Sequence, residues 1–92
     1  MDIYPASWDI LNKIFNKHKL EFSEVEEIFS NKPKIFKILA SDQYGQTRYK
    51  AFGNTDSGKY ITVVFIKEEC NIKVITARKM TEKEKSKFKG SK

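Results

Sequence analysis

The stretch Tyr60-Ile61-Thr62-Val63-Val64-Phe65-Ile66 decides the fold of this chain. Its residues are mostly β-branched or aromatic, and apolar side chains fall on both alternating faces, which is typical of a strand in the middle of a sheet. Polar turn residues bound it on both sides, at 54–58 and at 67–71. We therefore expect short turns to join it to strands at 48–52 and 72–76, which gives an antiparallel meander.

The residues before this meander predict two helices and one further strand. Ser7 precedes apolar residues at spacings of three and four that continue to His18, so Ser7 is expected to cap a first helix. Ser23-Glu24-Val25-Glu26 fits a capping box and opens a second helix that ends at Asn31. The short apolar run Ile35–Leu39 suits a fourth strand.

The last segment predicts a third helix with a basic surface. Thr81-Glu82-Lys83-Glu84 is another capping box, but Phe88 is the one large apolar side chain after it, so we expect this helix to be mobile or to need a partner. No strand is expected in residues 1–7. The predicted fold class is α+β: an N-terminal helical hairpin packed on a three- to four-stranded antiparallel sheet, followed by a basic C-terminal helix. Residues 1–92 suit a single domain.

The positive charge is concentrated at the C-terminal end. Residues 1–70 contain ten Lys/Arg and ten Asp/Glu, whereas residues 71–92 contain eight Lys/Arg and two Asp/Glu, so the last segment accounts for the whole net charge of +6. Such a gradient suits a polyanion or an acidic protein partner. A solvated, lysine-rich tail that only aids solubility explains the same composition.

Membrane, metal and disulfide chemistry find no support in the sequence. No apolar run approaches the roughly 20 residues that span a bilayer, and the first residues lack the pattern of a signal peptide. The single cysteine, Cys70, cannot form an internal disulfide, so a cytoplasmic location is expected. One histidine and one cysteine far apart form no ligand pattern, and we expect neither a metal nor a cofactor.

His18 is a candidate general base. It lies at the predicted end of the first helix between Lys17 and Lys19, and neighbouring positive charge favours the neutral imidazole that a base requires. A histidine that interacts with the carbonyl groups at a helix end is the structural alternative.

Arg48 and Arg78 are the two arginines among eighteen basic residues. A guanidinium can clamp a phosphate with two parallel hydrogen bonds, which an ammonium cannot do. We expect both to project from neighbouring strands, with Arg78 facing solvent at a strand end. Ordinary surface salt bridges are an equally good reading. Tyr49 and Tyr60 could stack on bases or could simply belong to a sheet face.

Taken together, these segments resemble the BrnT family in their order and spacing. The closest similarity joins Ile75-Thr76-Ala77-Arg78-Lys79-Met80-Thr81-Glu82-Lys83-Glu84 to the ending Ile-[Ser/Thr]-Ala-Arg-x-[Ala/Met]-Thr-x-x-Glu of that family. The resemblance runs from Trp8 to about Phe88. Lys19 replaces the family's glycine after the histidine, so a left-handed helix end there would carry a side chain. Ser23 replaces the first of two glutamates. The other matching segments are Trp8-Asp9, Asn16-Lys17-His18, Phe22 with Glu24, Arg48-Tyr49, and Gly58-Lys59-Tyr60-Ile61-Thr62-Val63-Val64-Phe65.

The resemblance implies a RelE-like fold and the toxin half of a type II toxin–antitoxin pair. Its activity would be that of a metal-independent endoribonuclease that uses the ribose 2′-hydroxyl as internal nucleophile and arrests translation. The implied partners are RNA and a BrnA-like ribbon-helix-helix antitoxin, which also binds operator DNA, with a heterotetramer as the expected complex.

The resemblance also implies roles for the candidate residues. Arg48 and Arg78 would hold the scissile phosphate and stabilise the charge that develops on its oxygens. His18, or failing that Lys17, would transfer the proton of the 2′-hydroxyl, and Glu24 would orient that base. The RNA-binding residues would be Lys79, Lys83, Lys85, Lys87 and Lys89, with Tyr49.

Two rival functions remain open from the sequence. One is a non-catalytic relative that binds RNA or a protein partner through the same basic surface, and the other is a structural module with a solubilising tail. Cleavage of RNA that resists a metal chelator supports the enzyme, whereas a salt-sensitive gel shift without cleavage supports the binding module.

Overall fold

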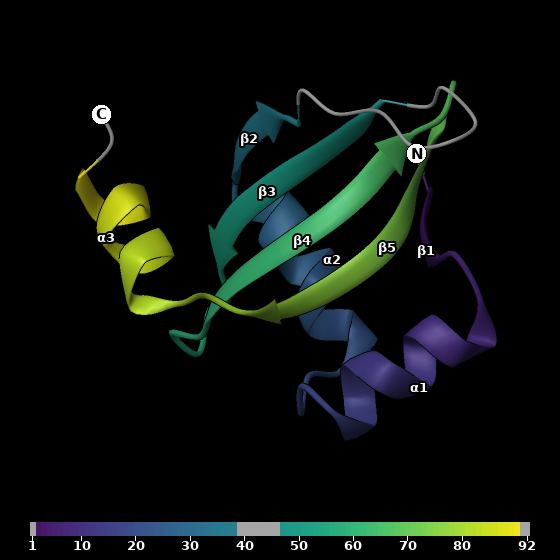
Figure 1. Cartoon of the computed structure of the whole chain (residues 1–92), viewed down its shortest axis with the longest axis horizontal. Coiled ribbons are helices and arrows are strands. Elements are labelled where there is room, and N and C mark those ends of the chain that lie inside the picture. The colour runs from purple at the N-terminus through teal and green to yellow at the C-terminus, as the bar shows by residue number, and fades with distance from the viewer. Residues whose placement is uncertain (1, 39–46, 91–92) are drawn as a thin grey trace.

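The computed structural model describes residues 2–38 and 47–90 and folds them as helices on a twisted sheet (Figure 1). The elements in chain order are β1 (Asp2–Pro5), α1 (Trp8–Asn16), α2 (Phe22–Ser30), β2 (Lys34–Lys37), β3 (Arg48–Asn54), β4 (Tyr60–Lys67), β5 (Asn71–Lys79) and α3 (Glu82–Gly90).

The sheet has five strands in the order β1-β5-β4-β3-β2, so β4 is its central strand, as its apolar sequence predicted. Strands β2 to β5 pair antiparallel. The predicted fourth strand is confirmed at β2, although residue 39 of its predicted range lies outside the described residues. The α+β class is thus correct.

Strand β1 corrects the prediction of an antiparallel sheet with three or four strands and of no strand in residues 1–7. It pairs parallel to β5, with Ile3 opposite Ile72, and makes the sheet mixed. The hydroxyl of Tyr4 donates a hydrogen bond to Glu68 beside β5. Four residues that end in a proline carry little strand signal of their own, and a pairing with residues about seventy positions away leaves no local pattern in the sequence.

Strand β5 is longer than predicted and runs to Lys79. A bulge lies opposite the step from Val64 to Phe65, because Val64 pairs with Thr76 and Phe65 pairs with Val74. The extra residue, Ile75, changes the alternation of β5, so a strand read by strict alternation ends too early. As a result Arg78 lies inside the strand rather than after it.

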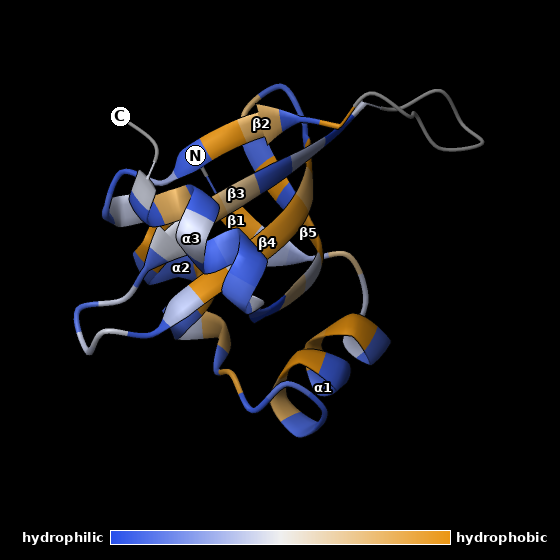
Figure 2. Ribbon diagram, turned by 60° about the vertical axis from the view of Figure 1, so that its left-hand side comes forward, coloured by the Kyte–Doolittle hydropathy of each residue, from blue (hydrophilic) through white to orange (hydrophobic). Residues whose placement is uncertain are grey.

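The core lies between the sheet and helices α1 and α2, which cover one face together. Alternate β4 side chains point into it and meet Ile14 of α1 and Val25 and Ile28 of α2. Figure 2 shows α1 with alternating apolar and polar residues, as expected for a helix that buries one side. At Gly53 of β3 an added Cβ would lie 2.8 Å from the Cβ of Ile28, so the close approach of α2 to the sheet requires a glycine there.

The helix starts follow local capping rules, with one correction. Ser7 caps α1 as predicted, and its hydroxyl accepts a hydrogen bond from the amide of Ile10 at 3.2 Å. Helix α2 is capped by Glu21 rather than Ser23, and the amide of Glu21 donates to the carboxylate of Glu24 at 2.9 Å. Glu21 and Ser23 each have a glutamate three residues later, so the sequence offered two overlapping capping boxes.

The chain leaves α1 through a residue in the left-handed region, shortly after the helix ends. Lys19, two residues beyond the Lys17 cap, has φ of 58°, and the amide of Leu20 donates to the carbonyl of Ile14 at 3.1 Å, six residues back. Leu20 is fully buried, so its packing holds this geometry in place. The expectation that a side chain would occupy a left-handed helix end is confirmed.

Helix α3 lies on the sheet face opposite α1 and α2. Its capping box is confirmed: Thr81 Oγ1 accepts from the amide of Glu84 at 3.1 Å, and the amide of Thr81 donates to Glu84 at 3.0 Å. Among its described residues none is buried, and it contacts the sheet through Phe88 against Tyr60 and through Glu84. The expected mobility of this helix stays a prediction.

Candidate functional site

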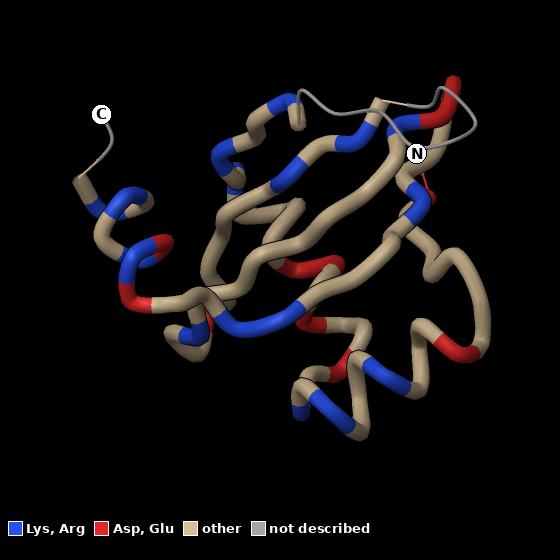
Figure 3. The backbone as a smooth tube through the Cα atoms, viewed as in Figure 1, with Lys and Arg blue, Asp and Glu red and all other residues tan. Residues whose placement is uncertain are grey.

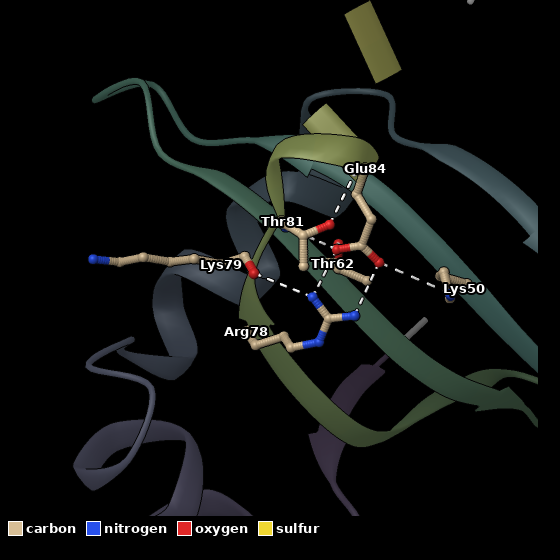
Figure 4. A network of polar contacts seen from close by, with 6 residues as sticks. All are labelled: Lys50, Thr62, Arg78, Lys79, Thr81 and Glu84. Carbon is tan, nitrogen blue, oxygen red and sulfur yellow. Dashed lines mark hydrogen bonds and ion pairs between the residues drawn. The ribbon is translucent and has the colours of Figure 1, made fainter. Parts of the chain in front are cut away.

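An ion pair with two hydrogen bonds joins β5 to α3 (Figure 4). Arg78 Nη1 lies 2.6 Å from Glu84 Oε1, and Arg78 Nη2 lies 2.9 Å from Glu84 Oε2, so the guanidinium and carboxylate meet end to end. The Glu84 side chain is only 14% exposed and that of Arg78 is 36% exposed. Arg78 therefore lies inside β5 in an ion pair, as in the salt-bridge reading, rather than after the strand and facing solvent.

The surroundings of Glu84 stabilise its charged form. Thr62 Oγ1 donates to the carboxylate at 3.2 Å, the amide of Thr81 donates as well, and Lys50 Nζ lies 4.0 Å away. The hydrogen bonds from Arg78, and then the Thr81 amide, the charge of Arg78 and the Thr62 hydroxyl, lower the pKa of Glu84 to about 2, although burial opposes the shift. The same pair raises the pKa of Arg78.

Register and capping together create this arrangement. Arg78 pairs with Thr62 across β4 and β5, and directly opposite residues of paired strands share a face. The chain then changes direction at Thr81, where α3 begins. The capping box directs the Glu84 side chain back toward the N-terminus of α3 and onto the sheet face that carries Arg78.

Arg48 lies on the same sheet face but not beside Arg78. It pairs with Ile66 of β4, four residues along the strand from Thr62, which corresponds to about 13 Å. The two arginines project from β3 and β5, which β4 separates, so the prediction of neighbouring strands is wrong. Lys50, two residues after Arg48 and on the same face, is the cation that approaches the Arg78–Glu84 pair.

His18 follows α1 and is half-buried. Its pKa is lowered from 6.5, first by burial and then by the charges of Lys17, Lys13 and Arg78. The predicted direction is correct, although burial is the larger cause. The contribution of Arg78 places its charge within electrostatic range of the imidazole. Lys17 is the exposed C-cap of α1.

Glu24 has a partner other than His18. Its Oε2 lies 2.7 Å from Lys59 Nζ and its Oε1 accepts the amide of Glu21, and both contacts lower its pKa, with Lys59 the larger cause. No hydrogen bond joins Glu24 to His18 within the described part of the chain. Within the described residues Glu24 is thus paired with Lys59 rather than with His18.

Two clefts adjoin at Lys59. One, of about 500 Å³, lies between the two N-terminal helices and the turn before β4, and the other, of about 250 Å³, lies between that turn, the end of β5 and α3. The smaller cleft is lined by three lysines, Lys59, Lys79 and Lys85, without an acidic side chain among its lining residues. The larger one is lined by Phe15, Asn16, Lys19, Glu21, Glu24 and Lys59.

Four lysines and two glutamates lie along α3, where Lys is coloured blue and Glu red (Figure 3). Lys85 and Lys89 lie 5.4 and 5.0 Å from the centre of the Tyr60 ring, and Lys87 lies 4.9 Å from that of Phe36. Lys83 is exposed. Tyr49 lies apart from all of them, since its ring stacks on Phe65 at 5.6 Å against the core.

Within residues 2–38 and 47–90, no three His, Cys, Asp or Glu side chains gather as a metal site would require. Over the same residues, no helix has the length and apolar character that crossing a membrane demands. Cys70 is exposed.

Sequence reasoning missed three residues of this site: Glu84, Lys50 and Lys59. Glu84 was recognised only as a capping residue, and nothing local pairs it with Arg78. The alternation of β3 from Arg48 would have placed Lys50 on the same face. Lys59 is adjacent to the predicted turn at 54–58, where a basic residue is unremarkable.

Comparisons with known proteins agree with this architecture. The crystal structure of the Brucella abortus ribonuclease toxin BrnT matches with a TM-score of 0.64 and 22% sequence identity, over 89% of this chain and 99% of that chain. This likeness concerns the fold. Among curated proteins, none matches the sequence significantly. Residues 8–84 match the family described as the ribonuclease toxin, BrnT, of type II toxin–antitoxin systems. This range includes His18, Arg78 and Glu84. The chain therefore belongs to the BrnT family of ribonuclease toxins of type II toxin–antitoxin systems.

Proposed function

We propose that this protein is a metal-independent endoribonuclease that inhibits translation by cleaving RNA in the cytoplasm. The observation that carries the proposal is Arg78, a firmly held guanidinium whose charge reaches a half-buried histidine of lowered pKa. A fixed cation and a neutral base are two groups that cleavage by a ribose hydroxyl can use.

In the proposed reaction His18 accepts the proton of the 2′-hydroxyl. The 2′-oxygen then forms a bond to the adjacent phosphorus, and the bond from phosphorus to the 5′-oxygen breaks. Lys17 supplies a proton to that leaving oxygen, and Arg78 stabilises the negative charge on the non-bridging oxygens. The products are a 2′,3′-cyclic phosphate and a 5′-hydroxyl, so no metal-bound water is needed.

The remaining basic residues would bind the RNA backbone. Arg48 and Lys50 lie on the Arg78 face and suit flanking phosphates. Lys59 and Glu24 would define the larger cleft beside them. Tyr49 has no part in this proposal because its ring packs on Phe65. Five lysines near the C-terminal end would also bind RNA phosphates: Lys79, Lys83, Lys85, Lys87 and Lys89.

The proposed protein partner is a BrnA-like ribbon-helix-helix antitoxin, bound in a heterotetramer. Membership of a toxin–antitoxin family supports an antitoxin of some kind. Two large apolar side chains of α1 support a protein-binding surface there, since Trp8 is 79% exposed and Phe15 is 57% exposed.

The test is incubation of the purified protein with a labelled RNA, with and without a metal chelator. Chelator-resistant cleavage with cyclic phosphate ends, lost in Arg78→Ala, is the expected result. A salt-sensitive gel shift without cleavage would favour the second candidate, a non-catalytic RNA-binding module. The closing of one end of Arg78 by Glu84 is the observation that favours it.

A further inference from the structure

Arg78 has two N–H groups left over after its structural contacts. A guanidinium carries five N–H donors. Nη1 uses both of its hydrogens, one toward Glu84 and one toward the carbonyl of Lys79 at 3.2 Å, and Nη2 uses one toward Glu84. Among the described residues no partner takes the Nε hydrogen or the second Nη2 hydrogen. These two N–H bonds lie along the same edge of the planar guanidinium and point in the same direction.

From this geometry we infer that Glu84 is a positioning residue that holds Arg78 so that its Nε–Nη2 edge binds a phosphodiester oxyanion side-on. The inference rests on the proposed function and deepens it, because it assigns the phosphate to one edge of one arginine. A carboxylate on the Nη1–Nη2 end leaves the other two-donor edge intact, and either edge has the spacing to hold two oxygens of a phosphate.

Glu84 does not act as a stand-in for the phosphate that RNA must displace. Its carboxylate is held by Arg78, by the hydroxyl of Thr62 and by the amide of Thr81, and it is nearly buried. Displacement would break all of these contacts and open the capping box of α3. The edge that remains belongs to a side chain that is a third exposed, so a ligand can reach it without such a rearrangement.

The charges around the edge suit an anion. Lys50 Nζ lies 4.0 Å from Glu84, so the carboxylate charge is shared between two cations rather than directed at an incoming phosphate. His18 is near enough for the charge of Arg78 to lower its pKa.

The experiment compares Glu84→Gln with the matched control Glu82→Gln. Glutamine preserves a capping box, so α3 still forms, but its amide offers one acceptor and one donor where the guanidinium needs two acceptors. Glu82 lies in the same helical turn, and its side chain is almost fully exposed, with Lys85 Nζ nearby at 3.6 Å. We expect kcat of Glu84→Gln to fall by about 10²-fold, because a misplaced transition-state contact costs about that much, with the thermal midpoint measured on the same samples. Glu82→Gln should cleave like the wild type.

A second readout does not depend on cleavage. The two arginines give two Nε–H signals in nitrogen-15 NMR spectra, and Arg48→Lys assigns them. A 2′-deoxy oligonucleotide, which cannot be cut, should shift the Arg78 Nε–H signal of the wild type and shift it far less in Glu84→Gln.

The outcomes separate the inference from the proposed function. Wild-type cleavage in Glu84→Gln, or faster cleavage, would overturn the positioning role, and so would an Arg78 Nε–H signal that the oligonucleotide leaves unmoved. A wild-type protein that cuts no RNA but shows the NMR shift would refute the proposed activity and uphold the arginine edge as an anion site.

Discussion

Lys59 Nζ lies 2.7 Å from Glu24 Oε2 and so joins the turn before β4 to the first turn of α2. Lys59 also lines both clefts, so it is the one cation shared between them. We expect Lys59→Ala to weaken RNA binding and to lower the log–log salt dependence by about 0.7, as the loss of one phosphate contact to a single strand should do. Stability should fall by less than about 1 kcal/mol, because Lys59 is 41% exposed.

The matched control for Lys59 is Lys67→Ala. Lys67 is exposed at the other end of β4, away from both clefts. Binding titrations at several salt concentrations would compare the two variants, and equal salt slopes for both would remove Lys59 from the RNA path.

Arg78→Ala should affect both rate and stability. Loss of a transition-state contact predicts a decrease in rate of about 10²–10³, or about 2.7–4 kcal/mol. The variant also leaves the nearly buried Glu84 without its main partner, which should destabilise the fold by about 1–3 kcal/mol. Cleavage rates and denaturant midpoints on one preparation would measure the two effects.

Arg78→Lys separates these contributions. Lysine keeps the charge near Glu84 but loses the two-donor edges, so we expect much of the stability to return while the rate stays low. Full cleavage by Arg78→Lys would mean that charge alone is sufficient.

Acid should weaken the link between α3 and the sheet. The pKa of Glu84 in the fold is about 2 against an ordinary 4.5, so its stabilising contribution is complete above 4.5 and is lost as the pH falls toward 2. The contribution is at most about 3 kcal/mol and less after solvent screening at Arg78. The difference in thermal midpoint between the wild type and Glu84→Gln should shrink across this window. A difference in thermal midpoint that stays constant down to pH 2 would show that the ionised Glu84 carboxylate does not stabilise the fold.

The pH dependence of cleavage should report His18. Its pKa lies below 6.5, so the neutral base predominates at neutral pH and the acid limb of the rate profile should have a midpoint below that value. Profiles of kcat/KM against pH for the wild type and His18→Gln would test this. A midpoint above 6.5, or the same acid limb in His18→Gln, would assign the titration to another group.

Lys19→Gly should stabilise the protein slightly. A side chain in the left-handed region costs about 1–2 kcal/mol, and glycine removes that cost while losing roughly 0.5–1 kcal/mol to the greater freedom of the unfolded chain. A net gain of up to about 1 kcal/mol is expected in denaturant unfolding. Lys19→Ala removes the same ammonium but keeps the Cβ, so it should show no gain.

Features fixed by neighbouring residues were predicted well from the sequence. The central strand β4, the Ser7 cap and the Thr81 capping box depend on patterns within a few positions. Strand β1 was missed because its stability comes from the distant β5. The start of α2 was misplaced because Glu21 and Ser23 each fit the capping pattern, and the structure uses Glu21.

The site divides in the same way. Composition identified both arginines and the basic C-terminal segment, and the charges beside His18 gave the direction of its pKa shift. The contact between Arg78 and Glu84 depends on a strand register, a bulge that changes the alternation of β5, and a turn into α3. The Thr81 capping box predicted the turn, but the register and the bulge that bring Arg78 opposite Glu84 have no local signal in the sequence.

The Arg78–Glu84 contact also makes the order of α3 a measure of the state of the site. None of the described α3 residues is buried, so little apolar packing holds this helix on the sheet. The Glu84 carboxylate that binds Arg78 therefore also anchors α3 to β5. Amide hydrogens in the first turn of α3 should therefore exchange with solvent at a rate set by how often the clamp opens. A partner that pulls Glu84 away would melt the helix and release the arginine in one cooperative step, whereas RNA on the free edge would slow the exchange.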